Sequence, residues 1–329
     1  MVISKTPFRI SFFGGGTDFP DWYLKNDGFV ISSAIDKFCY ISCRVLPPFF
    51  EHKYRISYSI VEDAPDINSI KHKAVREILN KFNLPYGIEI HSDADIPARS
   101  GIGSSSSFSV GLLNALYALQ NQKISKSNLA EEAIHIEQNV LHENVGSQDQ
   151  VAAAFGGMNA IYFKKNGKII VDPLNITEKS KQNFNQHLML FFTGFQRSSS
   201  DIALKQIENI NANVEKLNHL HNLAKEAHDI LIKKKNLNLF GELLNYSWNV
   251  KKSLADNISN DNINKIYDQA IKAGALGGKV LGAGGGGFIL LFVEPKNKIK
   301  VLDKLDNILH VPFKFCRSGS EIIYSDIKF

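Results

Sequence analysis

A loop rich in glycine and serine, from Pro97 to Ser107, leads directly into a helix-forming segment. Gly101 and Gly103 permit backbone angles and a close approach that a side chain would forbid. The serines from 104 to 107 place hydroxyl groups at the helix start, where unpaired N–H groups and the helix dipole favour an anion. A flexible turn with a serine N-cap is the alternative, but apolar residues continue at helical spacing at positions 110, 112, 113, 116 and 119. The segment therefore predicts a phosphate-binding loop fixed to a packed helix.

A second polar segment follows the first predicted strand, which carries Arg9 and ends in three consecutive glycines at 14 to 16. Glycines at such a place let the backbone approach a ligand. Thr17 and Asp18 come next, and the carboxylate of Asp18 is suited to accept hydrogen bonds from sugar-type hydroxyl groups. A bend in the chain with an Asx turn is the alternative explanation.

Two carboxylates form a third group. Glu137 lies on a predicted helix, and Asp149 lies at the opening of the next helix, in the segment Gly-Ser-Gln-Asp-Gln. One carboxylate that ligates Mg²⁺ and another that takes a proton from a hydroxyl are the pair that phosphoryl transfer uses. Solvated helix carboxylates are the alternative for each residue taken alone.

The fourth segment is a run of glycines between Leu281 and Phe288. Gly282, Gly284 and Gly287 satisfy the spacing of a dinucleotide-binding loop, but a strand and not a helix follows them, so that context fails. The glycine-serine loop lacks the Lys-Ser/Thr of a Walker A sequence, and the serines lack a G-x-S-x-G elbow, which ranks a hydrolase low. The histidines do not form the H-E-x-x-H zinc motif.

Apolar periodicity and turn residues predict the elements that must position these segments. We expect strands at Ile3–Phe13, Phe29–Ile35, Phe38–Val45, Tyr54–Ile60, Gly87–His91, Asn159–Phe163, Lys168–Val171 and His187–Phe192. We expect helices at Ser69–Lys81, 104–120, 127–143, 147–154, Ser198–Lys233 and Leu237–Leu254, and then the order helix, strand, helix, strand, strand. The polar, unpatterned stretch Thr177–Gln186 is the predicted domain boundary.

Composition excludes several classes of protein. The 329 residues contain 44% hydrophobic and 22% charged residues, an ordinary globular composition long enough for two domains. The net charge of +5 is mild, and the one tight basic run, Lys233 to Lys235, lacks the interleaved aromatic residues of a nucleic-acid surface. Three cysteines without a C-x-x-C pair favour neither a disulfide framework nor a zinc site. No apolar run approaches a membrane helix, and the amino terminus lacks a secretion pattern, so we expect a cytoplasmic protein.

The four segments, taken in order, resemble the motifs of the GHMP kinase superfamily, which includes galactokinase, homoserine kinase and mevalonate kinase. The resemblance covers almost the whole chain. It implies an α+β fold with a ribosomal protein S5-like amino-terminal domain at residues 1–180 and a ferredoxin-like carboxy-terminal domain at residues 181–329. The two domains would enclose a cleft for ATP and an acceptor.

The resemblance also implies roles for individual residues. It places the ATP phosphates on Gly101, Gly103, Ser104, Ser105 and Ser106, with Mg²⁺ on Ser105 and Glu137. Asp149 would orient or deprotonate the acceptor hydroxyl, and Arg9 would stabilise the charge in transfer. The acceptor would lie against Gly15, Gly16, Thr17 and Asp18 from the first domain and Gly284, Gly285 and Gly286 from the second.

Within the superfamily, the Gly-Gly-Gly-Thr-Asp loop departs from the Gly-Glu-His-Thr-Asp pattern of galactokinase. It is most similar, with Gly-Ser-Gln-Asp-Gln and Thr-Gly-Phe-Gln-Arg at 193–197, to the kinases of D-glycero-D-manno-heptose 7-phosphate. These phosphorylate the anomeric hydroxyl for nucleotide-activated heptose in bacterial surface glycans. Arg197 would then hold the existing phosphate, with Arg99 a second candidate. A kinase of a free sugar such as fucose, and a regulator that binds sugar and ATP without turnover, remain open.

The expected partners are accordingly small molecules. We expect a sugar phosphate substrate, no nucleic acid and no membrane, with a homodimer possible.

Overall fold

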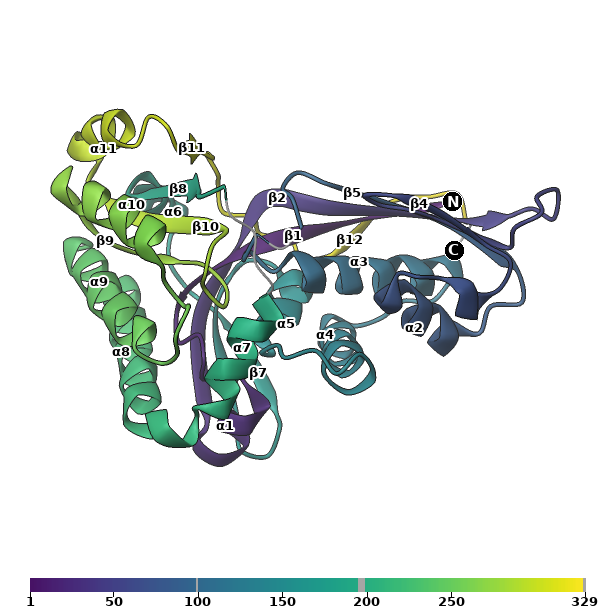
Figure 1. The fold of residues 1–329 in the computed structure, drawn as a ribbon, viewed down its shortest axis with the longest axis horizontal. Helices are drawn as coiled ribbons and strands as arrows, with labels where there is room; N and C mark the ends of the chain where they lie inside the picture. Colours follow the sequence, from purple (N-terminus) through teal and green to yellow (C-terminus); the bar gives the residue numbers. More distant parts are fainter. Residues whose placement is uncertain (99, 195–198, 328–329) are drawn as a thin grey trace.

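Two β-sheets lie side by side in the computed structural model, and each carries its own helices (Figure 1). The structure describes residues 1–98, 100–194 and 199–327. Among the described helices, none has the length and apolar character needed to span a membrane.

The first sheet has eight described strands in the order β12-β1-β2-β5-β3-β4, with β6 paired to β2 and β7 paired to β6. Strand β2 organises it, because β1 pairs along most of its length while β6 pairs with its first half and β5 with its second. The strands are β1 Val2–Phe13, β2 Gly28–Leu46, β3 Tyr54–Ser57, β4 Val61–Ala64, β5 Gly87–Ala94, β6 Met158–Phe163, β7 Ile169–Pro173 and β12 Glu321–Ser325.

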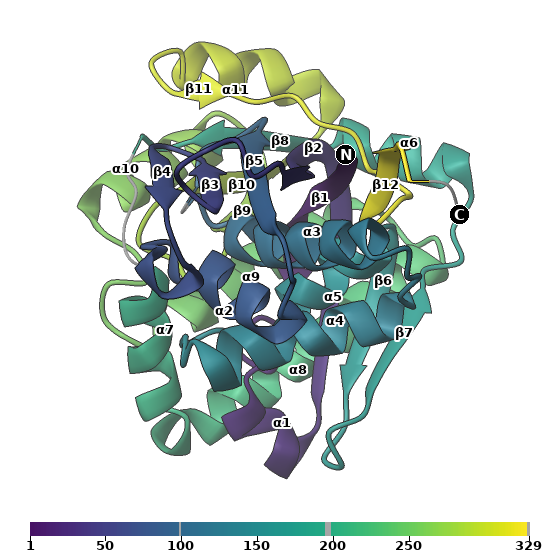
Figure 2. The same ribbon diagram turned by 90° about the vertical axis from the view of Figure 1, so that its right-hand side faces the viewer.

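Helices cover one face of this sheet, with α3 packed along β1 and β2 (Figure 2). Helix α3 is apolar nearly all round, since it lies between the sheet and the helices α4 and α5. The helices of this half are α1 Pro20–Asn26, α2 Lys73–Phe82, α3 Ser104–Leu119, α4 Lys126–His135 and α5 Gln148–Phe155, with a 3₁₀ turn at Ile67–Ser69 and a π-helical turn at Ile136–Val140.

The second sheet has the antiparallel order β11-β8-β10-β9 among the described strands. With helices between β8 and β9 and between β10 and β11, this is the split β-α-β arrangement of a ferredoxin-like domain. Its strands are β8 Leu188–Phe192, β9 Ala275–Val280, β10 Phe288–Val293 and β11 Leu309–His310. The remaining helices are α6 Glu178–Gln186, α7 Ser199–Glu208, α8 Val214–Ile232, α9 Asn238–Lys252, α10 Asp261–Lys272 and α11 Lys298–Lys304, with 3₁₀ turns at Asn211–Asn213 and Pro295–Asn297.

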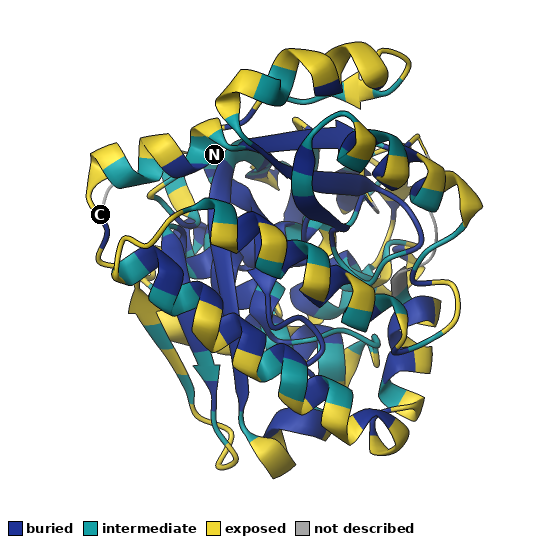
Figure 3. Cartoon of the chain, turned by 90° about the vertical axis from the view of Figure 1, so that its left-hand side faces the viewer, coloured by how far each residue is buried: buried dark blue, intermediate teal, exposed yellow. Residues whose placement is uncertain are grey.

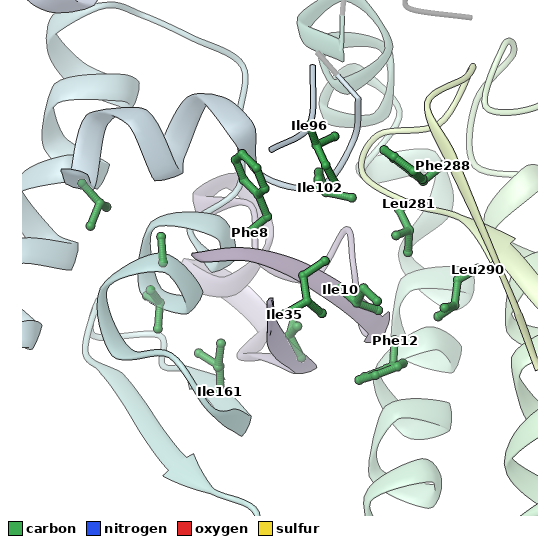
Figure 4. Close-up of a cluster of buried hydrophobic side chains, with 14 of the residues drawn as sticks. Phe8, Ile10, Phe12, Ile35, Ile96, Ile102, Ile161, Leu281, Phe288 and Leu290 are labelled. Carbon is green, nitrogen blue, oxygen red and sulfur yellow. The ribbon is translucent and has the colours of Figure 1, made fainter. Parts of the chain in front are cut away.

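A continuous apolar core joins the two sheets. Figure 4 shows Ile10 and Phe12 of β1 facing Leu281, Phe288 and Leu290 of the second sheet. Buried residues line the inside of both sheets while the outer faces of the helices are exposed (Figure 3). The two halves are therefore held as one framework around the loops that lie between them.

The predicted fold class is confirmed in its α+β character and in its two sheets, each with its own helices. The division into two domains at residue 180 stays a prediction. One strand from beyond residue 180 nonetheless belongs to the first sheet. The chain end returns to the first sheet, because β12 pairs with β1 and Phe315 bridges to Ile35.

Several predicted element bounds were wrong for local reasons. Phe29–Ile35 and Phe38–Val45 are one strand, β2, which continues through Asp36, and Tyr54–Ile60 ends early at Ser57. The polar stretch at 177–186 is helix α6, capped by the hydroxyl of Thr177, so polarity there marks an exposed helix face.

The other differences concern helices and the chain end. The helix predicted at Ser69–Lys81 begins at Lys73, after a 3₁₀ turn, and the one at 127–143 gives way to a π-helical turn at Ile136. The segment predicted as one helix from residue 198 to 233 contains α7, a 3₁₀ turn and α8. Strand β9, with its Gly277 and Gly278, is missing from the predicted order of the final elements.

Candidate active site

Arg9 and Asp149 form the centre of the site. Arg9 Nε lies 2.7 Å from Asp149 Oδ1 and Nη2 lies 2.6 Å from Oδ2, a bidentate pair in which the arginine side chain is almost fully buried. The register of β1 against β2 shifts on both sides of Arg9, between Pro7 and Arg9 and again after Ser11. Such irregularities re-aim side chains at the end of a strand. The structure thus brings the two predicted catalytic residues together.

The glycine-serine loop lies against this pair. Arg9 donates from Nη1 to the carbonyl of Gly101 at 2.8 Å and from its backbone N–H to Ile102 at 3.1 Å. Gly101 and Gly103 both have positive φ, +83° and +77°, and a β-carbon on Gly103 would lie 3.4 Å from Asp149 Oδ2. Helix α3 starts directly after Gly103, so its amino-terminal amide groups and dipole are directed at the space beside Asp149.

Glu137 provides a carboxylate that fits a metal ion. Its side chain is completely buried, and Oε2 accepts hydrogen bonds from Ser106 Oγ at 2.8 Å and Gln150 Nε2 at 2.6 Å. Among the described residues, Oε1 has no hydrogen-bond partner. Burial raises the pKa of Glu137 to about 7, against the opposing effect of Ser109 and the two donors already named. A buried carboxylate oxygen without a partner is of the kind that Mg²⁺ takes as a ligand, so metal binding by Glu137 fits the geometry and stays a prediction.

The three loop serines differ in position. Ser106 is buried and bonds to Glu137, whereas Ser105, the predicted metal contact, is exposed on the loop surface. Ser104 is half-buried at the first position of α3. Ser106 is therefore the serine that the described structure joins to Glu137, and metal contact through Ser105 stays a prediction.

The Gly-Gly-Gly-Thr-Asp loop packs beside α5. Asp18 is buried, and its Oδ1 accepts from the Gly16 amide at 2.9 Å while Oδ2 accepts from Gln148 Nε2 at 2.8 Å. Burial raises the pKa of Asp18. Thr17 acts inside the loop, since its buried hydroxyl donates to Gly14 and accepts from the Phe29 amide. Thr17 therefore braces the loop, and the acceptor contacts predicted for Gly15, Gly16, Thr17 and Asp18 stay predictions.

The late glycines form a loop that rests on the glycine-serine loop. A β-carbon on Gly282 would lie 2.9 Å from the backbone of Gly101, and one on Gly287 would lie 2.2 Å from the Ser100 carbonyl. Figure 4 shows the neighbouring pair Ile102 and Leu281 at this contact. The predicted substrate contacts Gly284, Gly285 and Gly286 lie between these two points, with Gly285 N bonded to Ile258.

Two buried lysines of the second half were missed by the sequence reasoning. Lys251 on α9 donates to the Gly282 carbonyl at 2.7 Å, and Lys279 on β9 donates to the Phe12 carbonyl at 3.0 Å. Burial lowers the pKa of Lys251 to about 8, with Asp18 and Asp149 raising it and Arg9 lowering it, and burial also lowers the pKa of Lys279 well below its ordinary value. Nothing in the sequence indicates that these lysines are buried. Lys251 is the first of two adjacent lysines at a helix end, a pattern that is typical of a solvent-exposed surface.

The predicted phosphate-binding arginines, Arg197 and Arg99, lie outside the described residues.

The comparisons with known proteins agree with this geometry. The family model described as "GHMP kinases N terminal domain" matches residues 68–157, and "GHMP kinases C terminal" matches residues 229–310. The chain is 30% identical to the D-glycero-alpha-D-manno-heptose 7-phosphate kinase of Campylobacter jejuni, over 97% of both chains. It is 24% identical to the bifunctional fucokinase/GDP-fucose pyrophosphorylase of Arabidopsis thaliana, over 91% of this chain and 30% of that protein.

Among solved structures, the chain is similar to a D-glycero-D-manno-heptose 1-phosphate kinase from Bacteroides thetaiotaomicron. The TM-score is 0.81, the identity 26%, and the match covers 99% of this chain and 100% of the other. A mevalonate kinase shares the fold at a TM-score of 0.73 and 19% identity, over 97% and 100% of the two chains. With both family domains matched and a full-length relative at 30% identity, the chain belongs to the GHMP kinases, a family of ATP-dependent phosphotransferases.

Proposed function

We propose that this protein transfers the γ-phosphoryl group of ATP to the anomeric hydroxyl of D-glycero-D-manno-heptose 7-phosphate, giving the 1,7-bisphosphate. The observation that carries the proposal is the bidentate Arg9–Asp149 pair, which lies between the phosphate loop and the loop that holds Asp18. A hydroxyl acceptor bound at this point would lie near its proton acceptor and near the loop that we propose to hold the phosphate. The choice of a heptose as the acceptor rests on the Campylobacter jejuni relative, which the match covers over 97% of both chains.

The reaction divides among the residues of the first half. The amide groups at the start of α3 hold the ATP phosphates, and Asp149 orients the acceptor hydroxyl and takes its proton as the oxygen bonds to the γ-phosphorus. The bond from that phosphorus to the β,γ-bridging oxygen breaks, and ADP leaves. Arg9 fixes Asp149 in place and offsets negative charge at the loop.

Glu137, with Ser106 or Ser105, would hold Mg²⁺, which when bound neutralises charge on the phosphates. Ionised Glu137 is required for this, and a cation in the site lowers its raised pKa. Without a cation, Glu137 would be about half protonated near neutral pH, and binding of a cation would favour its ionised form.

Two features support an acceptor that already carries a phosphate. The names of the Campylobacter jejuni relative and of the Bacteroides thetaiotaomicron structure both specify a heptose phosphate, although at different positions. The matches to fucokinases at 24% identity keep a free sugar as the second candidate.

A substrate panel tests the proposal. Purified protein with Mg²⁺ and ATP is offered heptose 7-phosphate, heptose 1-phosphate, free heptose and L-fucose, and ADP release is measured with the product's phosphorus NMR spectrum. The proposal expects turnover of the 7-phosphate and a new anomeric phosphate signal coupled to H1. Turnover of fucose or of the 1-phosphate in its place would refute the assigned acceptor.

The Asp149→Asn variant tests the mechanism separately. It keeps the side-chain size but removes the proton acceptor, so we expect turnover to fall at least about a hundredfold with ATP affinity unchanged. Near-normal turnover would remove Asp149 from the reaction. Protein that binds ATP and sugar but transfers no phosphoryl group to any acceptor would indicate the regulator instead.

A further inference from the structure

Lys251 is a charged side chain of the second half that reaches the Gly14–Asp18 loop of the first half. It lies on the last turn of α9 and is almost fully buried. One hydrogen bond to the Gly282 carbonyl, at 2.7 Å, uses one of the three donors of its ammonium group. Among the described residues the other two donors have no partner, in a place that is screened from water, and a buried cation without further partners is costly.

The space next to the ammonium lies over Gly15. A methyl group on Gly15 would point at three polar atoms: Lys251 Nζ at 3.6 Å, Gln148 Nε2 at 3.7 Å and Ser11 Oγ at 4.0 Å. Among the described residues, Ser11 Oγ and Gln148 Oε1 are buried without a hydrogen-bond partner. Polar groups from β1, α5 and α9 thus converge on one small volume, and two of them have unmet hydrogen-bonding capacity.

Asp18 supplies the opposite charge at this point. Its carboxylate attracts the Lys251 ammonium and is held by Gly16 and Gln148. The two described residues nonetheless form no ion pair within 4.0 Å. An ammonium and a carboxylate that attract each other but form no ion pair suit a group that accepts from one and donates to the other, which a hydroxyl does.

We propose that Lys251 contacts the acceptor directly, and that a sugar hydroxyl bridges Lys251 and Asp18 in the space over Gly15, bordered by Ser11 and Gln148. The proposal rests on the kinase function above and names the residues that select its acceptor. Lys251 is then a contribution of the second half to the choice of substrate. Lys279 has another role, since its hydrogen bond to the Phe12 carbonyl ties β9 to β1.

The test compares Lys251→Met with Lys252→Gln. Lys252, the next residue on α9, lies near the Trp248 and Tyr267 rings, 5.9 Å and 6.0 Å from their centroids. For Lys251→Met we expect KM for the acceptor to rise about tenfold to a hundredfold, as for the loss of a hydrogen bond from a charged group, with KM for ATP within about twofold. Lys252→Gln should match the wild type in both constants.

Monodeoxy analogues of the acceptor identify the bridging hydroxyl. At one position, wild type should lose about tenfold or more in kcat/KM, and Lys251→Met should lose clearly less than wild type, because the variant has already lost the Lys251 part of the contact and only the Asp18 part remains to be removed. A structural role for Lys251 would instead raise both KM values or lower kcat equally for every analogue. Additive losses at all positions would overturn the proposal.

Gly15→Ala is a second variant that keeps Lys251. The added methyl has only contacts of 3.6 Å or more, so the protein should fold with an unchanged melting temperature while the methyl occupies the bridging position. KM for the acceptor should rise at constant KM for ATP, and unchanged acceptor KM would contradict the proposal. If heptose 7-phosphate proves not to be the acceptor, the same KM comparison with the sugar that is turned over still decides the role of Lys251, so the two failures are distinct.

Discussion

Replacing Glu137 with glutamine removes a buried charge and should make protein without metal more stable at alkaline pH. The carboxylate is completely buried, and its Oε1 has no partner among the described residues. A glutamine of the same shape keeps an oxygen for Ser106 and Gln150, and its amide can donate to the unpartnered hydroxyl of Ser109. The variant therefore removes the charge with little change of packing.

The size of the effect follows from the pKa of Glu137. Its ordinary value of 4.5 is raised to about 7 in the folded protein, mainly by burial. The folded state therefore binds a proton more tightly than the unfolded state, and the stability from this proton is full below pH 4.5 and is lost as the pH rises through 7. A shift of this size corresponds to about 2 to 3 kcal/mol of unfolding free energy between pH 5 and pH 8.5.

Urea unfolding of both proteins at pH 5 and at pH 8.5, with EDTA present, measures this difference. The stability of Glu137→Gln relative to wild type should increase by about 2 to 3 kcal/mol between the two pH values, because all other titrating groups contribute equally to both proteins. A non-hydrolysable ATP analogue is then added with and without Mg²⁺. Mg²⁺ should raise the melting temperature of wild type above the value with nucleotide alone, and it should not do so for the variant. An unchanged stability difference across this pH range would refute the buried, ionisable carboxylate on which the metal assignment depends.

Three further predictions concern the neighbouring loops. Arg9→Lys removes the two-point contact with Asp149 and the bond to the Gly101 carbonyl, so we expect kcat to fall at least about a hundredfold and the melting temperature to drop, measured by steady-state kinetics and calorimetry. Gly282→Ala would put a β-carbon 2.9 Å from the Gly101 backbone and should weaken ATP binding in calorimetric titration; unchanged affinity would show that the two loops move apart freely. The pKa of Lys251, lowered to about 8 by burial, predicts that kcat/KM for the acceptor falls as the pH rises through 8. Lys251→Arg should move this fall to higher pH. A fall at the same pH in the variant would disprove its assignment to Lys251.

The sequence was informative where chemistry is local. Consecutive glycines, a serine-rich helix start and paired acidic residues imply backbone approach to an anion and proton transfer, and these constraints act within a few residues. The structure places Arg9, Asp149 and Gly103 within contact of one another, as the motif order implied. The ferredoxin-like second domain was implied by the family resemblance and not by the predicted order of elements, which lacked β9.

The contacts that depend on distant parts of the chain were not predictable in this way. Lys251 and Lys279 are separated from the Gly14–Asp18 loop by more than 200 residues, and only tertiary packing buries them beside it. Ser106 and Ser105 are adjacent identical residues, so only the rotation of α3 decides which one bonds to Glu137. The return of β12 to β1 had no signal either, because nothing in its five residues, Glu-Ile-Ile-Tyr-Ser, indicates with which strand they pair.

The central claim, that the Arg9–Asp149 pair phosphorylates a heptose phosphate at its anomeric hydroxyl, is tested most directly by one measurement. Heptose 7-phosphate is incubated with enzyme, Mg²⁺ and γ-¹⁸O-labelled ATP, and the product is analysed by phosphorus NMR and mass spectrometry. The account predicts a heptose bisphosphate that carries the labelled phosphoryl group on O1, formed by wild type and not by Asp149→Asn. A labelled phosphoryl group at any other oxygen, or equal product from the variant, would contradict it.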